Sequence, residues 1–160
     1  MYKATVRALM RYSVQKLNGG DASLLLRLAA PNAGIAFPGV NSWSTMFRPV
    51  VKTRERHITH QGIEECKAFA DRFVDERVQF HIEDILVNGP PWNTRVALRV
   101  QSYIEGPDGV DVYNNRAIAL LETRWGRLIA WEDYEDPERI TAWDAAKAAK
   151  AAGEKTTSSA

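Results

Sequence analysis

The stretch from Val110 to Pro137, VDVYNNRAIALLETRWGRLIAWEDYEDP, decides the fold of this chain. It predicts two long β-strands joined by a tight turn at Trp125-Gly126-Arg127. The second strand ends in an acidic, aromatic run, WEDYED at residues 131–136, and Pro137 stops it. The rest of the chain is expected to extend this sheet or to pack against it.

In the segments before the hairpin, apolar residues recur either at helical spacing or at every second position. Apolar residues recur at helical spacing in three places, which predicts helices at residues 2–17, 22–30 and 61–74. A period of two predicts further strands at 78–87 and 94–105, the first with a bulge near Asp84 where the apolar phase slips by one residue.

The remaining segments are less regular. A short strand is predicted at 35–37, and residues 38–60 read as a long loop with another short strand at 43–47. Beyond Pro137, an Ala-rich helix is predicted from about Glu138 to Ala152, followed by a disordered tail at 153–160.

Composition excludes several classes of protein. The chain has 160 residues, which indicates one domain, and a formal net charge of +1, which argues against a nucleic-acid-binding surface. No apolar run is long enough to span a membrane, and the N-terminal segment lacks the pattern of a secretory signal. Cys66 is the single cysteine, so an internal disulfide is impossible, and the expected compartment is the cytoplasm.

Several short motifs are similar to those of one superfamily. Phe37-Pro38-Gly39 ends the first strand, and Gln61-Gly62-Ile63-Glu64-Glu65 opens the third helix, where that superfamily often has Gly-Arg-Glu-Ala-Ile. Thr94 to Arg99 resembles its Val-Ala-Val-Arg strand, and Gly126 to Tyr134 resembles its closing Gly-Lys-Ile-x-x-Trp-x-Asp-Tyr. With the order of elements, these motifs make residues 1–145 resemble the nuclear transport factor 2-like superfamily, and within it the SnoaL-like group.

The resemblance implies an α+β fold shaped like a cone. A strongly curved mixed sheet would wrap around the N-terminal helices and leave an internal pocket, with residues 146–160 as a helical extension and tail. Ketosteroid isomerase, limonene-epoxide hydrolase, scytalone dehydratase and the polyketide cyclases are the enzyme relatives that it implies. They act on apolar small molecules with acid–base groups and without a cofactor, whereas many other members only bind or assemble.

Asp133 is the first candidate for catalysis, because it matches a catalytic carboxylate of the epoxide-hydrolase and cyclase branches. Alternation puts Ile129, Trp131 and Asp133 on one face of the last strand, and the family topology turns that face inward. A carboxyl group in an apolar pocket can hold a proton and act as an acid, or serve as a stronger base. The alternative is a strand-end aspartate that caps, pairs with an arginine or meets solvent.

Arg99 and Arg95 are the candidate partners of Asp133, because a buried charge needs an opposite charge. They share a strand face with Ala97. The epoxide hydrolases hold one arginine and two aspartates together, and the local match puts Arg95 at the arginine and Ala97 at the second aspartate. The second carboxylate is therefore missing at that position, and a solvated role for both arginines stays open.

Other side chains are expected to line the pocket or its mouth. Aromatic and polar residues make up this candidate ligand-binding set: Tyr12, Trp43, Phe47, Phe69, Tyr113, Asn115 and Trp131. For the pair Tyr113 and Asn115, a ladder of cross-strand polar contacts is the alternative. His57 and His60 have a spacing that occurs in metal sites, but no further ligand completes a set, so no metal is predicted.

The hairpin strands also predict a partner. Val96, Leu98 and Val100, with Ile118 and Leu120 beside Arg116, form an apolar face that the helices would leave bare, so a homodimer through this face is expected. Two functions remain open. One is a cofactor-independent isomerase, cyclase, dehydratase or hydrolase for a hydrophobic small molecule, and the other is a non-catalytic ligand-binding or dimerisation module.

Overall fold

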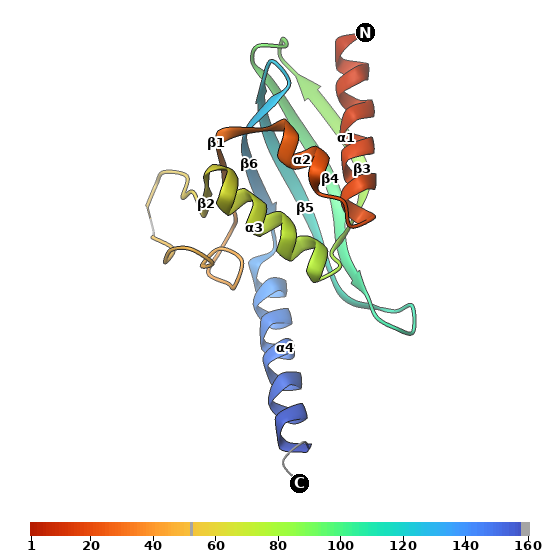
Figure 1. The fold of residues 1–160 in the computed structure, drawn as a ribbon, viewed down its shortest axis with the longest axis vertical. Helices are drawn as coiled ribbons and strands as arrows, with labels where there is room; N and C mark the ends of the chain where they lie inside the picture. The colour runs from red at the N-terminus through yellow and green to blue at the C-terminus, as the bar shows by residue number, and fades with distance from the viewer. Residues whose placement is uncertain (52, 158–160) are drawn as a thin grey trace.

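The computed structural model describes residues 1–51 and 53–157. Within these residues, six strands form one curved mixed sheet in the order β2-β1-β6-β5-β4-β3 (Figure 1). The four strands β3 to β6 are antiparallel neighbours, and β1 runs parallel to β6. The strand bounds are β1 Ala29–Ala36, β2 His60–Gln61, β3 Gln79–Asn88, β4 Thr94–Glu105, β5 Asp111–Arg124 and β6 Arg127–Glu135.

Three helices lie over one face of this sheet, and a fourth helix extends away from the sheet. Figure 1 shows α1 beside β3, α2 and α3 across the sheet, and α4 projecting away from the body of the molecule. The helix bounds are α1 Tyr2–Asn18, α2 Ser23–Leu28, α3 Gly62–Asp75 and α4 Pro137–Thr157. The predicted α+β fold, with a curved mixed sheet around N-terminal helices, is confirmed.

The central hairpin forms as the sequence predicts. Trp125 and Gly126 both have positive φ angles, 51° and 77°, which is the geometry of a two-residue turn between twisted antiparallel strands. The predicted bulge in β3 is also present, because the register with β4 shifts between Ile82 and Asp84. A second register shift, opposite Glu122 and Thr123, makes Leu128 line the interior and displaces Ile129 from the inner face that we predicted for it.

The strand β4 buries the face that we predicted to lie outside and exposes the face that we predicted to lie inside. Val96, Leu98 and Val100 are buried beneath the helices, whereas Arg95 and Arg99 are exposed on the outer face. The sequence was ambiguous here because the outer face of the sheet also carries apolar residues, so hydrophobic alternation alone could not identify the covered face. On β5, Arg116 and Ile118 lie on the outer face, as predicted.

Smaller differences occur at the ends of elements. The second helix is shorter than predicted, because its last residues belong to β1, which continues through Pro31 and Asn32. The predicted strand at 43–47 is a series of turns, in which Asn41 Oδ1 accepts hydrogen bonds from the backbone N–H groups of Trp43 and Ser44. The last helix extends to Thr157, so residues 153–157 of the predicted tail are helical, and 158–160 lie outside the described residues.

No helix in the described part of the chain combines the length and the apolar character that crossing a membrane requires. The longest, α4, is rich in Ala and Lys, and most of its side chains after Trp143 are exposed.

Candidate functional site

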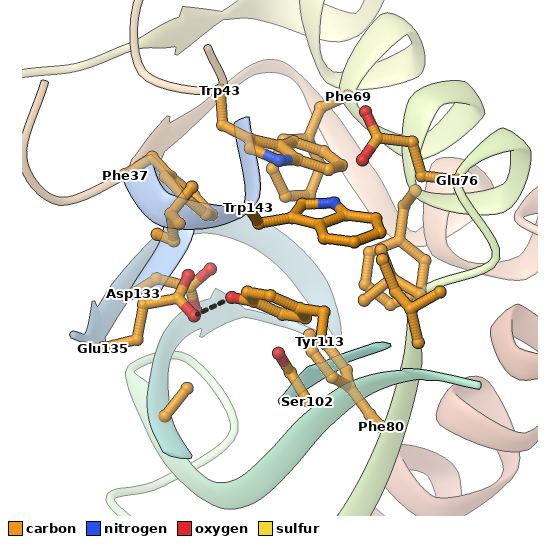
Figure 2. A pocket seen from close by; sticks show the side chains of 15 residues that line it. Phe37, Trp43, Phe69, Glu76, Phe80, Ser102, Tyr113, Asp133, Glu135 and Trp143 are labelled. Carbon is orange, nitrogen blue, oxygen red and sulfur yellow. Dashed lines mark hydrogen bonds between the residues drawn. The ribbon is translucent and has the colours of Figure 1, made fainter. Parts of the chain in front are cut away.

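A small cavity lies where the concave face of the sheet meets α3 and the first turns of α4 (Figure 2). Its volume is about 30 Å³. Most of its wall is aromatic or aliphatic, and its polar groups come from Glu76, Ser102, Tyr113, Asp133 and Glu135. The apolar wall consists of Phe37, Trp43, Phe69, Phe73, Val78, Phe80, Ile104, Ala117, Ile140 and Trp143.

Asp133 and Glu135 project into this cavity from the same strand. They are two residues apart on β6, so the pleat turns both side chains to the inner face, opposite Ala119 and Ala117 of β5. The small alanine side chains leave room for the carboxyl groups. Figure 2 shows the two carboxyl groups side by side, facing the Tyr113 hydroxyl.

Asp133 is only 6% exposed, and the one side chain of the described residues that donates a hydrogen bond to it is an indole. Trp131 Nε1 donates to Asp133 Oδ1 at 2.7 Å. Burial raises the pKa of Asp133 well above its ordinary value, and the indole hydrogen bond offsets part of that effect. Because β6 holds both residues on one face, the strand itself sets this geometry.

Glu135 has neutral hydrogen-bond partners on β5. Asn115 Nδ2 donates to Glu135 Oε2 at 3.0 Å, and the Tyr113 hydroxyl lies 3.5 Å from the same oxygen. Burial, followed by the negative charge of Asp133, raises the pKa of Glu135. Burial together with the nearby charge of Glu135 also raises the pKa of Tyr113, so the phenol stays protonated and can act as a donor.

Neither Asp133 nor Glu135 forms an ion pair with any residue that the structure describes. Glu76, the third acid on the cavity wall, differs in this respect, because Arg72 and Lys147 both pair with it. A buried carboxyl group beside a half-buried one, without a paired cation, disfavours the doubly charged state. The pair therefore holds a proton at a pH where ordinary carboxyl groups have lost theirs.

Polar contacts connect the three segments that cover the cavity, which are the loop at 41–46, α3 and α4. Ser42 donates from its backbone N–H and its hydroxyl to Asp144 of α4, at 3.0 and 2.6 Å. Arg72 of α3 donates to the carbonyl and hydroxyl of Ser42, and its guanidinium lies 4.1 Å from the centre of the Trp43 ring. The loop at 41–46, α3 and α4 are thus tied together above Trp43 and Trp143.

The structure places the predicted catalytic residues on opposite faces of the sheet. Asp133 lies inside, as predicted, but the expected pairing with Arg99 or Arg95 is wrong. Arg99 is 56% exposed and its Nε lies 3.0 Å from Glu83 Oε2 on the outer face. The long arginine side chains keep their charge in water, which costs less than burying it beside Asp133.

The predicted ligand-binding residues divide into three groups. Trp43, Phe69 and Tyr113 line the cavity, while Asn115 and Trp131 hold its carboxyl groups by hydrogen bonds. Tyr12 and Phe47 lie elsewhere, at 51% and 44% exposure. Tyr12 projects to the solvent side of α1, and Phe47 packs by its edge on His60, so placing these two in the pocket was wrong.

Sequence reasoning missed several residues of the cavity wall, and Glu135 and Trp143 are the two most relevant to the site. The strand period that places Asp133 inside applies equally to Glu135, two residues later, so the alternation held the signal. Glu135 was instead taken as part of an acidic strand end. Trp143 had no comparable signal, because the direction of α4 after Pro137 depends on packing.

His60 and Cys66 are core residues. His60 is fully buried, its Nδ1 lies 2.9 Å from Thr59 Oγ1, and burial lowers its pKa to about 4, so the ring is neutral. Burial raises the pKa of the Cys66 thiol to about 11. Within the described residues, no three His, Cys, Asp or Glu side chains gather as a metal site would require.

Comparison with known proteins gives a fold but no close relative. No protein-family model matches the sequence, and no curated protein matches it. An NTF2-like protein of unknown function from Burkholderia pseudomallei has a similar structure, with a TM-score of 0.62, 14% identity, and coverage of 84% of this chain and 95% of that one.

Two further similar structures are enzymes by their descriptions. A putative SnoaL-like polyketide cyclase from Jannaschia sp. has a TM-score of 0.54 and 17% identity, covering 84% of this chain and 90% of its own. The epoxide hydrolase/cyclase-like enzyme SalBIII, with a role in pyran ring formation in polyether salinomycin, has a TM-score of 0.58 and 12% identity, covering 84% and 92%. This chain therefore has the fold of the nuclear transport factor 2-like and SnoaL-like proteins.

Proposed function

We propose that this protein is a cofactor-independent acid–base enzyme that moves a proton within a hydrophobic small molecule. The observation that carries the proposal is the carboxyl pair of buried Asp133 and half-buried Glu135, which lies in a largely apolar cavity and has no paired cation among the described residues. One proton shared by two carboxyl groups provides an acid and a base together, which is what isomerisation, cyclisation and dehydration require.

The hydrogen bonds suggest a role for each carboxyl group. The Trp131 indole stabilises the charged form of Asp133, so Asp133 serves as the base. Burial and the negative charge of Asp133 raise the pKa of Glu135, so Glu135 holds the proton and serves as the acid. Oε1 would carry this proton, because Asn115 and Tyr113 both approach Oε2. The base would remove a proton from one substrate atom while the acid supplies one to another atom of the same molecule.

Substrate access requires movement of the cover. A cavity of about 30 Å³ has room for water but not for an organic substrate. Ile140 and Trp143 of α4 form part of the wall, so shifting the first turns of α4 would enlarge the space. The similar structures support the reaction class, because one is described as cyclase-like and one as a putative polyketide cyclase.

The test combines a carboxyl titration with a general probe of proton abstraction. In ¹³C NMR, the pair should retain a proton above pH 6, well beyond the ordinary carboxyl range. The probe is 5-nitrobenzisoxazole, in which a base takes the C3 proton, the N–O bond breaks, and the electron pair remains on oxygen as a nitrophenolate. Asp133→Asn should reduce its turnover at least about tenfold, while the exposed-site control Asp71→Asn should not. Ordinary pKa values for both carboxyl groups, or equal rates in wild type and Asp133→Asn, would contradict the proposal.

A second candidate, a non-catalytic module, is favoured by one observation. The cavity is only about 30 Å³, and Trp43 and Trp143 form part of its wall, as residues that plug a core would. In that case the carboxyl pair would only shape the core. If replacing Asp133 by Asn and Glu135 by Gln left ligand binding and turnover unchanged, this non-catalytic function would be supported.

A further inference from the structure

A second and larger cavity lies on the far side of Phe80 and Trp131 from the carboxyl pair. Its volume is about 170 Å³, and it lies between α1, α2 and the inner face of the sheet. The wall is almost wholly apolar and includes Val6, Leu9 and Val14 of α1 and Leu98 and Leu121 of the sheet. Phe80 is the one residue that lines both cavities.

Hydrogen bonds at both ends of α1 hold this space open. At the start of the helix, the Tyr2 hydroxyl lies 2.6 Å from Thr94 Oγ1, and Arg7 Nε donates to the carbonyl of Ile85 at 3.2 Å. At the end of the helix, Asn18 donates to the carbonyl of Phe80 and accepts from its backbone N–H, at 2.9 and 3.0 Å. These contacts fix α1 relative to the sheet, so its middle cannot collapse inward to fill the void.

The apolar stripe of α1 is accordingly left incompletely buried. Val6, Leu9, Met10 and Val14 are all only half-buried, and Leu17 is the single fully buried residue of α1. The short helix α2, which closes the same cavity with Leu25 and Leu28, has no fully buried residue. A guest in the cavity would complete the burial of both helices, which is the source of its binding energy.

One polar atom points to the chemistry of the guest. Ser13 lies on the cavity wall, and its Oγ is shielded from solvent with no hydrogen-bond partner among the described residues. A buried hydroxyl without a partner is unfavourable. Water is a poor occupant of so apolar a space, because a buried water molecule needs about two to four polar partners.

We propose that this cavity is a ligand site, separate from the carboxyl pair, for a small apolar molecule that carries one hydroxyl or carbonyl group directed at Ser13. An engineered apolar cavity of about 150 Å³ in another protein stays dry and binds benzene. The guest here is accordingly of about one ring, or a short chain of similar volume. The site does not depend on whether Asp133 and Glu135 are catalytic.

The experiment compares two probes of nearly equal size, benzyl alcohol and toluene, by methyl NMR. Both should shift the methyl signals of Val6, Val14, Leu98 and Leu121 in a saturable manner and leave those of Ile104 and Ile140, which line the first cavity, unchanged. Ser13→Ala should weaken benzyl alcohol binding about fivefold to tenfold, as expected for one lost hydrogen bond. The same variant should leave toluene binding unchanged.

A cavity-filling variant provides the second readout. Val14→Phe should abolish binding of both probes, and Leu9→Phe serves in its place if Val14→Phe does not fold. Val110→Phe, at an exposed position in a turn, is the matched control and should bind both probes as the wild type does. The proposal would be overturned by the absence of saturable shifts up to the solubility limit, by shifts confined to Ile104 and Ile140, or by Val14→Phe binding unchanged.

Discussion

The indole N–H of Trp131 donates a hydrogen bond of 2.7 Å to Oδ1 of Asp133, two residues further along the same face of β6. This contact is the main polar support of a carboxyl group that lies beside Glu135 in a largely apolar cavity. Trp131→Phe should keep most of the ring packing and remove the donor. The charged form of Asp133 then loses its stabilisation, so its pKa should rise by about one unit, which corresponds to about 1.4 kcal/mol.

Trp143→Phe is the matched control for that change. Trp143 also has a buried indole nitrogen, but this nitrogen has no hydrogen-bond partner among the described residues. The same substitution there should leave the pKa of Asp133 unchanged in a ¹³C NMR titration. Equal shifts in the two variants would show that ring packing, and not the Trp131 hydrogen bond, sets the acidity of Asp133.

Stability should fall as the pH rises across the neutral range. The pKa values of Asp133 and Glu135 are raised in the folded state, so between the ordinary carboxyl values and the raised ones the folded protein binds more protons than the unfolded chain. The free energy of unfolding therefore decreases with pH in that window, by up to about 1.4 kcal/mol per pH unit for each proton retained. Urea unfolding at pH 5 and pH 8 measures the decrease.

The double variant Asp133→Asn with Glu135→Gln should remove most of that dependence, because neither replacement titrates. The free energy of unfolding of the double variant, measured relative to that of the wild type, should therefore be higher at pH 8 than at pH 5. If wild type and variant lost stability in parallel over this range, other groups would be responsible and the raised pKa values would be disproved.

The contact between Ser42 and Asp144 should control how often the cover opens. Asp144→Ala removes the acceptor of two hydrogen bonds from Ser42 and also one of the two acidic partners of Lys147. Amide hydrogen exchange around Ile140 and Trp143 should accelerate about tenfold, the effect of one net hydrogen bond of about 1.4 kcal/mol. Asp71→Ala, which breaks an exposed ion pair with Lys67 on α3, should leave these amides unaffected.

We propose a homodimer interface on the outer face of the sheet. The sequence placed Val96, Leu98 and Val100 in this interface, but they are buried, so only Ile118 and Leu120 of the predicted face remain. Leu86, Ile118 and Tyr134 are exposed on the outer face. Light scattering at micromolar concentration should give twice the chain mass of 18.0 kDa. Ile118→Lys should yield monomers, whereas Val110→Lys, at a similarly exposed apolar residue in a turn, should not. A monomer mass for the wild type would contradict the interface.

The hairpin was predictable because its two strands and turn are specified locally. Trp125-Gly126 could only be a tight turn, and alternation fixed Trp131 and Asp133 on one face. The same rule failed for β4, because its outer residues pack beside exposed Ile118 and so both faces looked apolar. Which face of a strand is covered depends on the helix that packs against it, and that helix is distant from the strand in the sequence.

The carboxyl pair shows a different limit. The sequence identified Asp133 as a candidate acid, and the analogy with the epoxide hydrolases indicated that a second carboxylate was missing, because Ala97 stands at its position. The structure has its second carboxyl group at Glu135 on the same strand, opposite Ala117. Composition made Glu135 look solvated, because it stands in a run of charged residues, and only the position of α4 shows that it is covered.

The acids and their cover are also consecutive in the chain. Asp133 and Glu135 end β6, and Ile140 and Trp143 follow on α4 directly after Pro137. The last part of the sequence is therefore a natural point for protein engineering. Replacing α4 from Pro137 onward with other helices would change the size of the cavity while leaving β6, and the carboxyl pair that it carries, in place.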